Sequence, residues 1–132
     1  MIGMRRFIGY AEAVASLYPG KQYSVRDNDY EQFVWYETDT PKPGKAELDA
    51  KIAELEANEP VRCVREIRNW YLQQTDWTQG ADIRALRGPE WCATWDAYRQ
   101  QLRDITSSGV TPVIDEMGVV TGINWPNQPT LK

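Results

Sequence analysis

Five large apolar residues recur along residues 91–105 at spacings of four, three, four and three. These positions fall on one narrow stripe of an α-helix, because residues three and four apart share a face. Two of the five are tryptophans, so a second element is needed to cover this seam. Pro89 and Glu90 predict the first turn of the helix, which should end by residues 107–109. The seam consists of Trp91, Trp95, Tyr98, Leu102 and Ile105.

A second helical region precedes this seam. Nearly every residue of 45–58 favours helix, and residues 61–74 carry a further apolar face. Pro60 lies between them, where it either opens a new helix or kinks one long helix that runs to Gln74. We favour the break. The apolar stripes consist of Leu48, Ile52 and Leu55 in the first stretch, and of Val64, Ile67, Trp70 and Tyr71 in the second.

The first forty residues predict a small α+β unit. We expect a strand over residues 4–8, a helix over 10–17, and a hairpin that pairs residues 22–26 with 31–37 around a turn at 27–29. Residues 33–36 are apolar on both faces of the pleat. The helix can cover one face, and a partner or the later helices must cover the other.

The segment Pro41-Lys42-Pro43-Gly44 is the clearest linker, since two prolines and a glycine favour extended backbone. The predicted domains are therefore residues 1–40, the linker 41–44, and a helical domain over 45–132. The predicted fold class is α+β, with an N-terminal hairpin and helix, two or three further helices, and a C-terminal hairpin with an extended tail.

The last third of the chain supplies that hairpin and tail. Residues 75–80 are expected to end the preceding helix, and a polar loop should follow to Gly88. Residues 112–115 and 119–121 predict a hairpin with Gly118 in its turn, which should dock on another element because an isolated hairpin is marginal in water. Trp125 then stands in an extended, proline-flanked segment.

The composition argues against an enzyme. The chain has no histidine and only two cysteines, which excludes Ser–His and Cys–His catalysis and His-containing zinc sites in a lone chain. Asp27 and Asp29 flank a turn residue and have turn-forming rather than glycosidase character. Without nucleotide-binding glycine motifs or a calcium loop, we expect no catalytic residues, no metal and no cofactor. Cys63 and Cys92 are expected as buried free thiols.

The charge pattern and hydropathy limit the partners. Residues 1–59 hold 7 basic and 11 acidic side chains, and residues 60–132 hold 8 of each, so nucleic acid is not an expected partner. No apolar run approaches the ~18 residues of a membrane span, so no membrane contact is expected either. We expect a soluble protein made in a cytoplasm.

The six tryptophans are the most informative residues. Trp70, Trp91 and Trp95 fit an internal helix–helix seam. Trp77 in a polar segment and Trp125 in the tail are harder to hide, and exposed tryptophan is a frequent interface anchor. For Trp125 we favour contact with a partner over packing back on the domain. A basic stripe at every third residue is either a solvated face or a docking surface for an acidic partner, and it consists of Arg62, Arg65 and Arg68.

Three segments together resemble the tail-assembly chaperones of tailed bacteriophages. They are Thr-Asp-Trp-Thr-Gln at 75–79, the helix around Tyr98 and Arg99 at 95–104, and Trp-Pro-Asn-Gln-Pro at 125–129. Their order resembles that family over residues 62–129, and residues 17–20 with the 27–30 turn resemble its leader. The chain departs from the family pattern by an insertion at residues 110–123, which we expect to form a hairpin.

The resemblance implies a phage-encoded chaperone that binds the distal end of a tail fibre protein and assists its folding or trimerisation. Three copies per fibre trimer and a location in the host cytoplasm during assembly would follow. The alternatives are a structural component retained on the virion tail fibre, at the fibre tip near the receptor, and a protein that binds or hydrolyses carbohydrate with exposed tryptophans. From the residues themselves, we assign partner binding to Trp77, Trp95, Tyr98, Trp125, Pro126, Pro129, Arg62, Arg65 and Arg68.

Overall fold

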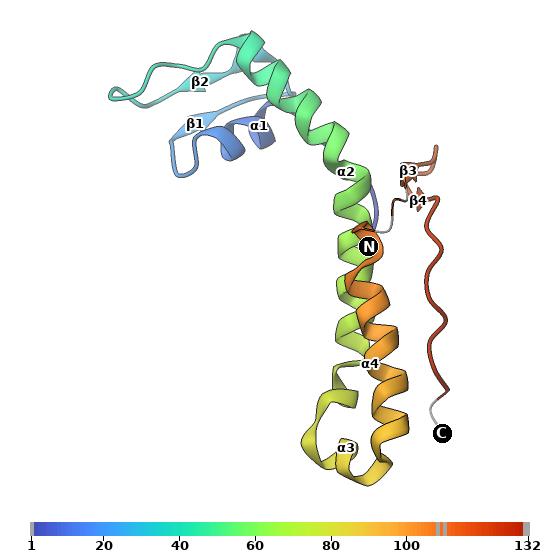
Figure 1. The fold of residues 1–132 in the computed structure, drawn as a ribbon. Coiled ribbons are helices and arrows are strands. Elements are labelled where there is room, and N and C mark those ends of the chain that lie inside the picture. Colours follow the sequence, from blue (N-terminus) through green and yellow to red (C-terminus); the bar gives the residue numbers. More distant parts are fainter. Residues whose placement is uncertain (1, 108, 110, 131–132) are drawn as a thin grey trace. The chain divides into compact units, whose positions relative to one another are not determined.

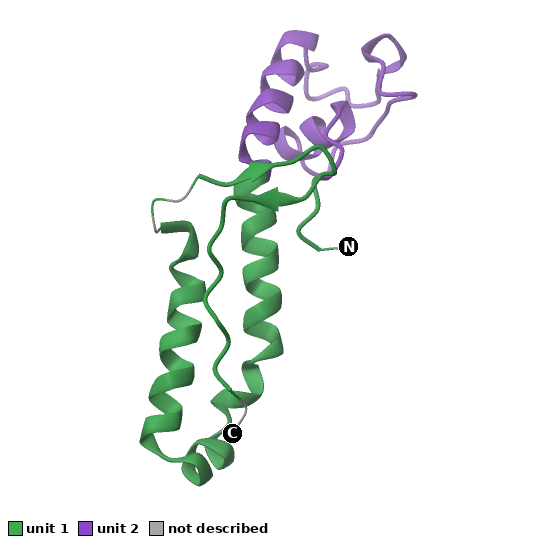
Figure 2. Cartoon of the chain, turned by 90° about the vertical axis from the view of Figure 1, so that its right-hand side faces the viewer, with its two compact units in different colours: residues 1–5, 60–132 green, residues 6–59 purple. Residues whose placement is uncertain are grey.

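The computed structural model describes residues 2–107, 109 and 111–130. It contains four α-helices and two small antiparallel hairpins, which confirms the α+β fold class (Figure 1). The chain forms two compact units: unit 1 contains residues 1–5 and 60–132, and unit 2 contains residues 6–59 (Figure 2). The division into domains at residues 41–44 stays a prediction, because these units describe packing and not independent folding.

Unit 2 begins with helix α1, Tyr10–Leu17, as predicted. The Glu12 carboxylate accepts a hydrogen bond from the Gly9 amide at 2.7 Å, which caps the first turn. Strands β1, Tyr23–Ser24, and β2, Val34–Trp35, form the expected hairpin, with Tyr23 opposite Trp35. The turn between them takes positive φ at Asp27 and Asn28, residue types that tolerate this conformation, and a 3₁₀ turn η1, Tyr30–Gln32, follows.

The two faces of this hairpin differ in their cover within unit 2. Phe33 is 3% exposed and packs into a core with Tyr10, Val14 and Leu48. Val34 is 45% exposed. The predicted two-sided apolar hairpin is therefore covered on one face by α1 and by the start of the next helix.

Helix α2 runs without interruption over Lys45–Gln74, with Pro60 inside it. The break that we favoured at Pro60 is therefore wrong. Proline removes one backbone hydrogen bond at a cost of about 3 kcal/mol, but strong helix formers surround it. Each half of the helix is also held by its own unit, since Leu48 is buried in unit 2 and Val64 is buried in unit 1.

The helical part of unit 1 continues from α2 into a 3₁₀ turn η2, Asp76–Gln79, then α3, Ala81–Arg87, and α4, Pro89–Arg103. Helix α4 begins at Pro89 as predicted. The expected polar loop up to Gly88 is instead mostly the helix α3. Residues 81–87 are good helix formers, and Gly88 ends the helix at a φ of 89° that glycine adopts without strain.

A second hairpin and the tail complete unit 1. After the 3₁₀ turn η3, Ile105–Ser107, strands β3, Val113–Ile114, and β4, Val120–Thr121, pair as predicted, with Gly118 in the turn. The strand expected at residues 4–8 is reduced to one bridge between Met4 and Val119, since the chain passes into unit 2 after Arg5. Residues 123–130 have no regular secondary structure, and they run along α2 and α4 (Figure 2).

Candidate functional site

An aromatic cluster lies where α4 meets the turn η2, and it consists of Trp77, Trp91, Trp95 and Tyr98. The Trp77 ring centroid is 5.9 Å from that of Trp91 and 5.6 Å from that of Trp95. Trp95 also lies 6.0 Å from Trp91 and 6.0 Å from Tyr98. Tilted and edge-on pairs at these distances are the favoured geometries of aromatic rings. The helical spacing of residues 91, 95 and 98 places their rings on one face of α4, as predicted.

The residues of the aromatic cluster differ in solvent exposure. Trp95 and Tyr98 form its buried base, and Trp77 is exposed. Trp95 is 0% exposed and Tyr98 is 5% exposed, whereas Trp77 is 46% exposed. Trp95 and Tyr98 were expected to bind a partner; both side chains are buried in this arrangement, and partner binding by them stays a prediction. Trp77 packs on Trp91 and Trp95, and it is the most exposed member of the cluster.

The turn that carries Trp77 is tied to both long helices by a buried arginine. Arg99 of α4 is 6% exposed and donates hydrogen bonds to the Leu72 carbonyl at 2.8 Å, to the Thr75 hydroxyl at 2.8 Å and to the Asp76 carboxylate at 2.9 Å. Thr78 is also buried, and its hydroxyl donates to the Thr75 carbonyl at 2.7 Å. Charge-assisted hydrogen bonds of this kind are short and strong, so they fix the Thr-Asp-Trp turn.

A bidentate ion pair fixes α3 to α4 beside the aromatic cluster. The Arg84 guanidinium donates to both carboxylate oxygens of Asp96, at 3.0 and 2.8 Å. Hydrogen bonding to Arg84 is the main reason why the pKa of the Asp96 carboxyl lies below its ordinary value. Neither residue was singled out from the sequence, because the pair joins positions in two different helices.

We expect this ion pair to make the stability of unit 1 depend on pH. Because the pKa of Asp96 is lower in the folded than in the unfolded chain, its contribution is complete above about pH 5. It is lost as the pH falls below about 4, through the lowered pKa of the folded state. Asp96→Asn should therefore reduce the urea midpoint at neutral pH, and the difference from the unmodified chain should narrow as the solution is acidified. Arg84→Met should produce the same convergence, whereas a difference that stays constant with pH would contradict the assignment.

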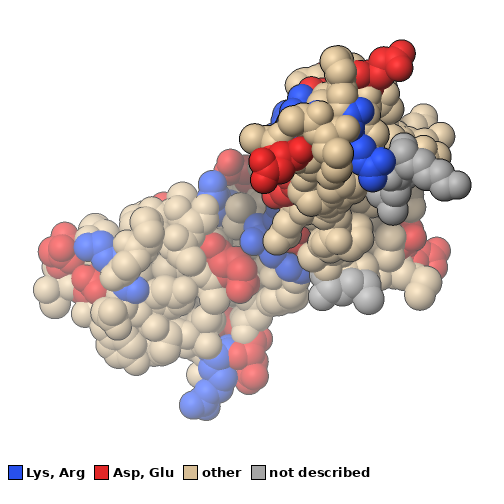
Figure 3. All heavy atoms as spheres, turned by 90° about the horizontal axis from the view of Figure 1, so that it is seen from below, with Lys and Arg blue, Asp and Glu red and all other residues tan. Residues whose placement is uncertain are grey.

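A hollow of about 710 Å³ lies next to the aromatic cluster, between the start of α4 and the tail. Trp91 and Trp95 line one side of it, and Pro129 and Thr130 line the other. The Arg87 guanidinium lies 5.9 Å from the centroid of the Trp91 ring, a cation–π distance. Figure 3 views the α3 end of unit 1, where most of the nearest surface is uncharged.

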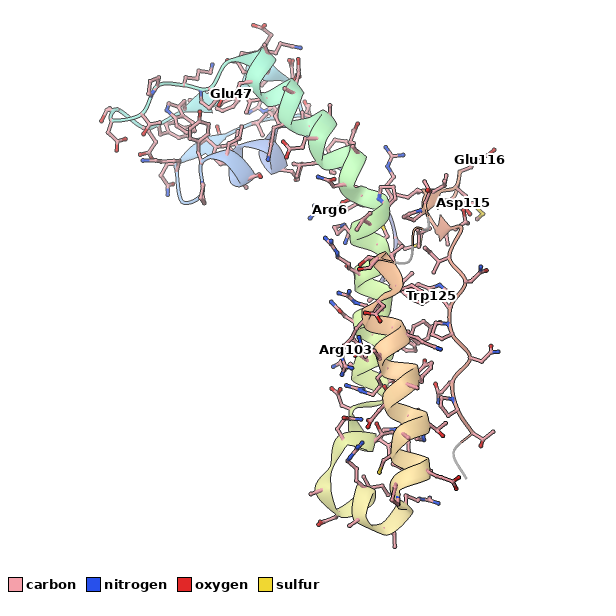
Figure 4. All side chains as sticks on the ribbon, viewed as in Figure 1. Arg6, Glu47, Arg103, Asp115, Glu116 and Trp125 are labelled. Atoms are coloured by element: carbon pink, nitrogen blue, oxygen red, sulfur yellow. The ribbon has the colours of Figure 1, made fainter. Side chains whose placement is uncertain are left out.

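The tail packs on its own unit. The Trp125 ring is half-buried, with its centroid 5.3 Å from that of Tyr71 in α2, and Figure 4 shows it on the side of the tail that faces the helices. Pro126 and Pro129 are also half-buried. The structure thus favours packing of Trp125 on its own domain, and a contact of these three residues with a partner stays a prediction.

The predicted basic stripe does not form one free surface. Arg62 donates to the Glu66 carboxylate at 2.8 Å and to the Met4 carbonyl at 2.7 Å, so it has an internal role. Arg68 donates to the Asn69 side chain at 3.1 Å, and Arg65 is exposed. The solvated-face alternative fits Arg65 best, and partner binding by Arg62, Arg65 and Arg68 stays a prediction.

Two further expectations concern the tryptophan core and the thiols. Trp91 is half-buried, but Trp70 is 41% exposed, so the expected place of Trp70 in the helix seam is wrong. Cys63 is a buried free thiol, as expected, whereas Cys92 is free but only half-buried.

In the described part of the chain, no three His, Cys, Asp or Glu side chains gather in a way that could hold a metal ion. Among the same residues, no helix has the length and apolar character needed to span a membrane.

The comparison with protein families gives one finding. Residues 61–130, more than half of the 132-residue chain, match the family model described as phage tail assembly chaperone protein. The match includes the aromatic cluster, the hollow and the tail. Neither a curated protein nor a solved structure matches the chain.

Proposed function

Since the chain belongs to the phage tail assembly chaperone family, we propose that it binds a tail fibre protein at its distal end and assists the folding and trimerisation of the fibre. The observation that carries the proposal is the 46% exposure of Trp77 above a buried aromatic base, within the matched region. Large aromatic residues at the surface with rigid support are typical anchors of protein interfaces.

The chemistry of this surface suits a chaperone rather than a catalyst. Trp77 is exposed and Leu86 in α3 is 79% exposed, so this end of unit 1 offers apolar contact area. A β-rich trimer forms many contacts between distant parts of its chains, so its folding is slow and its apolar surfaces stay uncovered for longer. In this proposal the chain covers such a surface until the trimer closes. Three copies per fibre would follow from the three-fold symmetry of the target.

Co-expression tests the proposal with Trp77 as the variable. Each tail fibre protein of the same phage is expressed alone, with the unmodified chain, and with Trp77→Ala, and the yield of soluble trimer is measured. We expect the cognate fibre to gain severalfold from the unmodified chain and to lose most of that gain with Trp77→Ala. Tyr36→Ser is the matched control, because Tyr36 is 61% exposed but belongs to unit 2.

Equal yields with and without the chain would contradict the chaperone role, and equal loss with Tyr36→Ser would contradict the assignment of Trp77. Mass spectrometry of purified virions distinguishes a chaperone that leaves in the host cytoplasm from a component retained on the tail fibre. We expect the chain to be absent from the virions.

A further inference from the structure

Two indole N–H groups of the aromatic cluster have no hydrogen-bond acceptor. The Nε1 atoms of Trp91 and Trp95 are buried, and neither donates to any acceptor in the described part of the chain. Trp35 in unit 2 behaves in the ordinary way, since its Nε1 donates to the Thr40 carbonyl at 2.8 Å. Buried donors are almost always paired in folded proteins, so two unpaired donors on neighbouring turns of one helix need an explanation.

Both tryptophans line the same hollow of about 710 Å³, and the opposite side of that hollow consists of Pro129 and Thr130. Trp91 and Trp95 give the hollow an aromatic lining on their side, and Trp95 is fully buried. Arg87 and Glu90 add one charge of each sign to the lining. The two tryptophans with unpaired indole donors are thus both lining residues of the hollow, and Pro129 and Thr130 are the tail residues at it.

The segment that now lies on this wall shows which chemistry fits there. It consists of Pro129 and Thr130, and Pro129 ends the proline-flanked stretch of residues 126–129. Within the described part of the chain, residues 123–130 make no hydrogen bond, and the ring of Trp125 on Tyr71 is their aromatic contact. The tail is thus held by packing alone, and its Pro129 occupies the edge of the hollow without pairing the indole donors.

We propose that this hollow binds an extended, proline-containing segment of the partner in the polyproline II conformation. Proline rings of the segment pack on Trp91 and Trp95, and its backbone carbonyls accept the two unpaired indole hydrogen bonds. Polyproline II segments suit such a site because their carbonyls are not used internally and their conformation is already fixed. The incoming segment replaces Pro129 and Thr130. This inference rests on the proposed function for the identity of the partner, a tail fibre protein.

Indole N–H resonances of the ¹⁵N-labelled full chain test the proposal directly. The probe is a synthetic decaproline peptide, and a glycine–serine peptide of the same length is its control. We expect decaproline to move the Trp91 and Trp95 indole protons downfield, as hydrogen bonding does, while the Trp35 indole stays in place. The glycine–serine peptide should move none of them.

Variants of the chain make the test quantitative. Trp91→Phe keeps an aromatic ring but lacks the donor, and it should weaken decaproline binding at least fivefold. Trp35→Phe, the matched control in unit 2, should leave the affinity unchanged. Pro129→Ala removes the proline that now lies at the edge, so it should tighten binding severalfold.

The proposal is overturned if decaproline at millimolar concentration leaves both indole resonances in place, or if the glycine–serine peptide moves them equally. It is also overturned if they move with protein concentration alone, which would identify the tail of a second copy as the occupant. Failure of the proposed function gives a different result. The yield of soluble fibre trimer would then be the same with and without the chain, while decaproline would still shift the Trp91 and Trp95 indole resonances. A different result would contradict this inference alone. In that case the yield of fibre trimer would fall with Trp77→Ala but not with Trp91→Phe, and decaproline would shift neither indole resonance.

Discussion

Replacing Trp95 by alanine is expected to lower the free energy of unfolding of the chain by about 3–5 kcal/mol. Trp95 is the largest fully buried side chain described, and its ring contacts three other rings at 5.6–6.0 Å. The substitution removes its apolar burial and leaves a cavity that neighbouring rings on a rigid helix fill poorly. Such a loss is a large share of the ~5–15 kcal/mol that stabilises a typical domain.

Urea unfolding followed by far-ultraviolet circular dichroism measures this effect, and Trp70→Ala is the matched control. Trp70 lies in the same unit and is the same residue type, but it is 41% exposed. We expect this control to lose less than about 1 kcal/mol. Similar losses in the two variants would show that Trp95 is not the centre of the packing.

The sequence correctly predicted the helices and strands that are determined by residues close to them in the chain. The helix at 89–103 follows from its own apolar spacing and from Pro89 at its first position, and the second hairpin follows from Gly118 at its turn. The position of Trp77 outside the seam also followed from the polar character of its segment. In each of these cases, the information lies within about fifteen residues of chain.

The errors arose where distant residues decide the outcome. The residues around Pro60 fit either the first turn of a new helix or the interior of one long helix. Packing of both halves of α2 determines that the long helix forms. Residues 81–87 were expected as a polar loop although their residue types favour helix, and the ion pair that fixes this helix joins Arg84 to Asp96 in the next helix. The contact of Trp125 with Tyr71 is likewise a long-range one that nothing in the tail itself indicates, while partner binding by Trp125 stays a prediction.

The sequence likewise predicted one part of the candidate site and missed another. The aromatic residues were visible in the sequence, but the arginine that holds their turn was not singled out as a site residue. Arg99 hydrogen-bonds to residues that lie 23 to 27 positions earlier in the chain. From the sequence alone, an arginine beside an apolar helix face is expected to extend its charged group into solvent. A weak signal did exist, since Arg99 lies one turn after Trp95 on the same helix.

Arg99→Met should be the second most damaging change, with a loss of about 3 kcal/mol in the free energy of unfolding of the chain. Methionine preserves much of the length and apolar contact of the side chain, but it cannot donate to Leu72, Thr75 or Asp76. The Thr75 side chain is buried and loses a charged donor, so water cannot restore that bond.

The partner carboxylate supplies the control that separates a buried hydrogen-bond network from a simple ion pair. The Asp76 side chain is 65% exposed, so Asp76→Asn leaves a well-hydrated group and should cost less than about 1 kcal/mol. If the two variants instead lost equal stability, the ion pair would account for the whole effect of Arg99. Because Arg99 fixes the turn that carries Trp77, Arg99→Met should also increase acrylamide quenching of tryptophan fluorescence under folding conditions, and Asp76→Asn should not. A stable Arg99→Met chain with unchanged quenching would show that the turn holds Trp77 without this arginine.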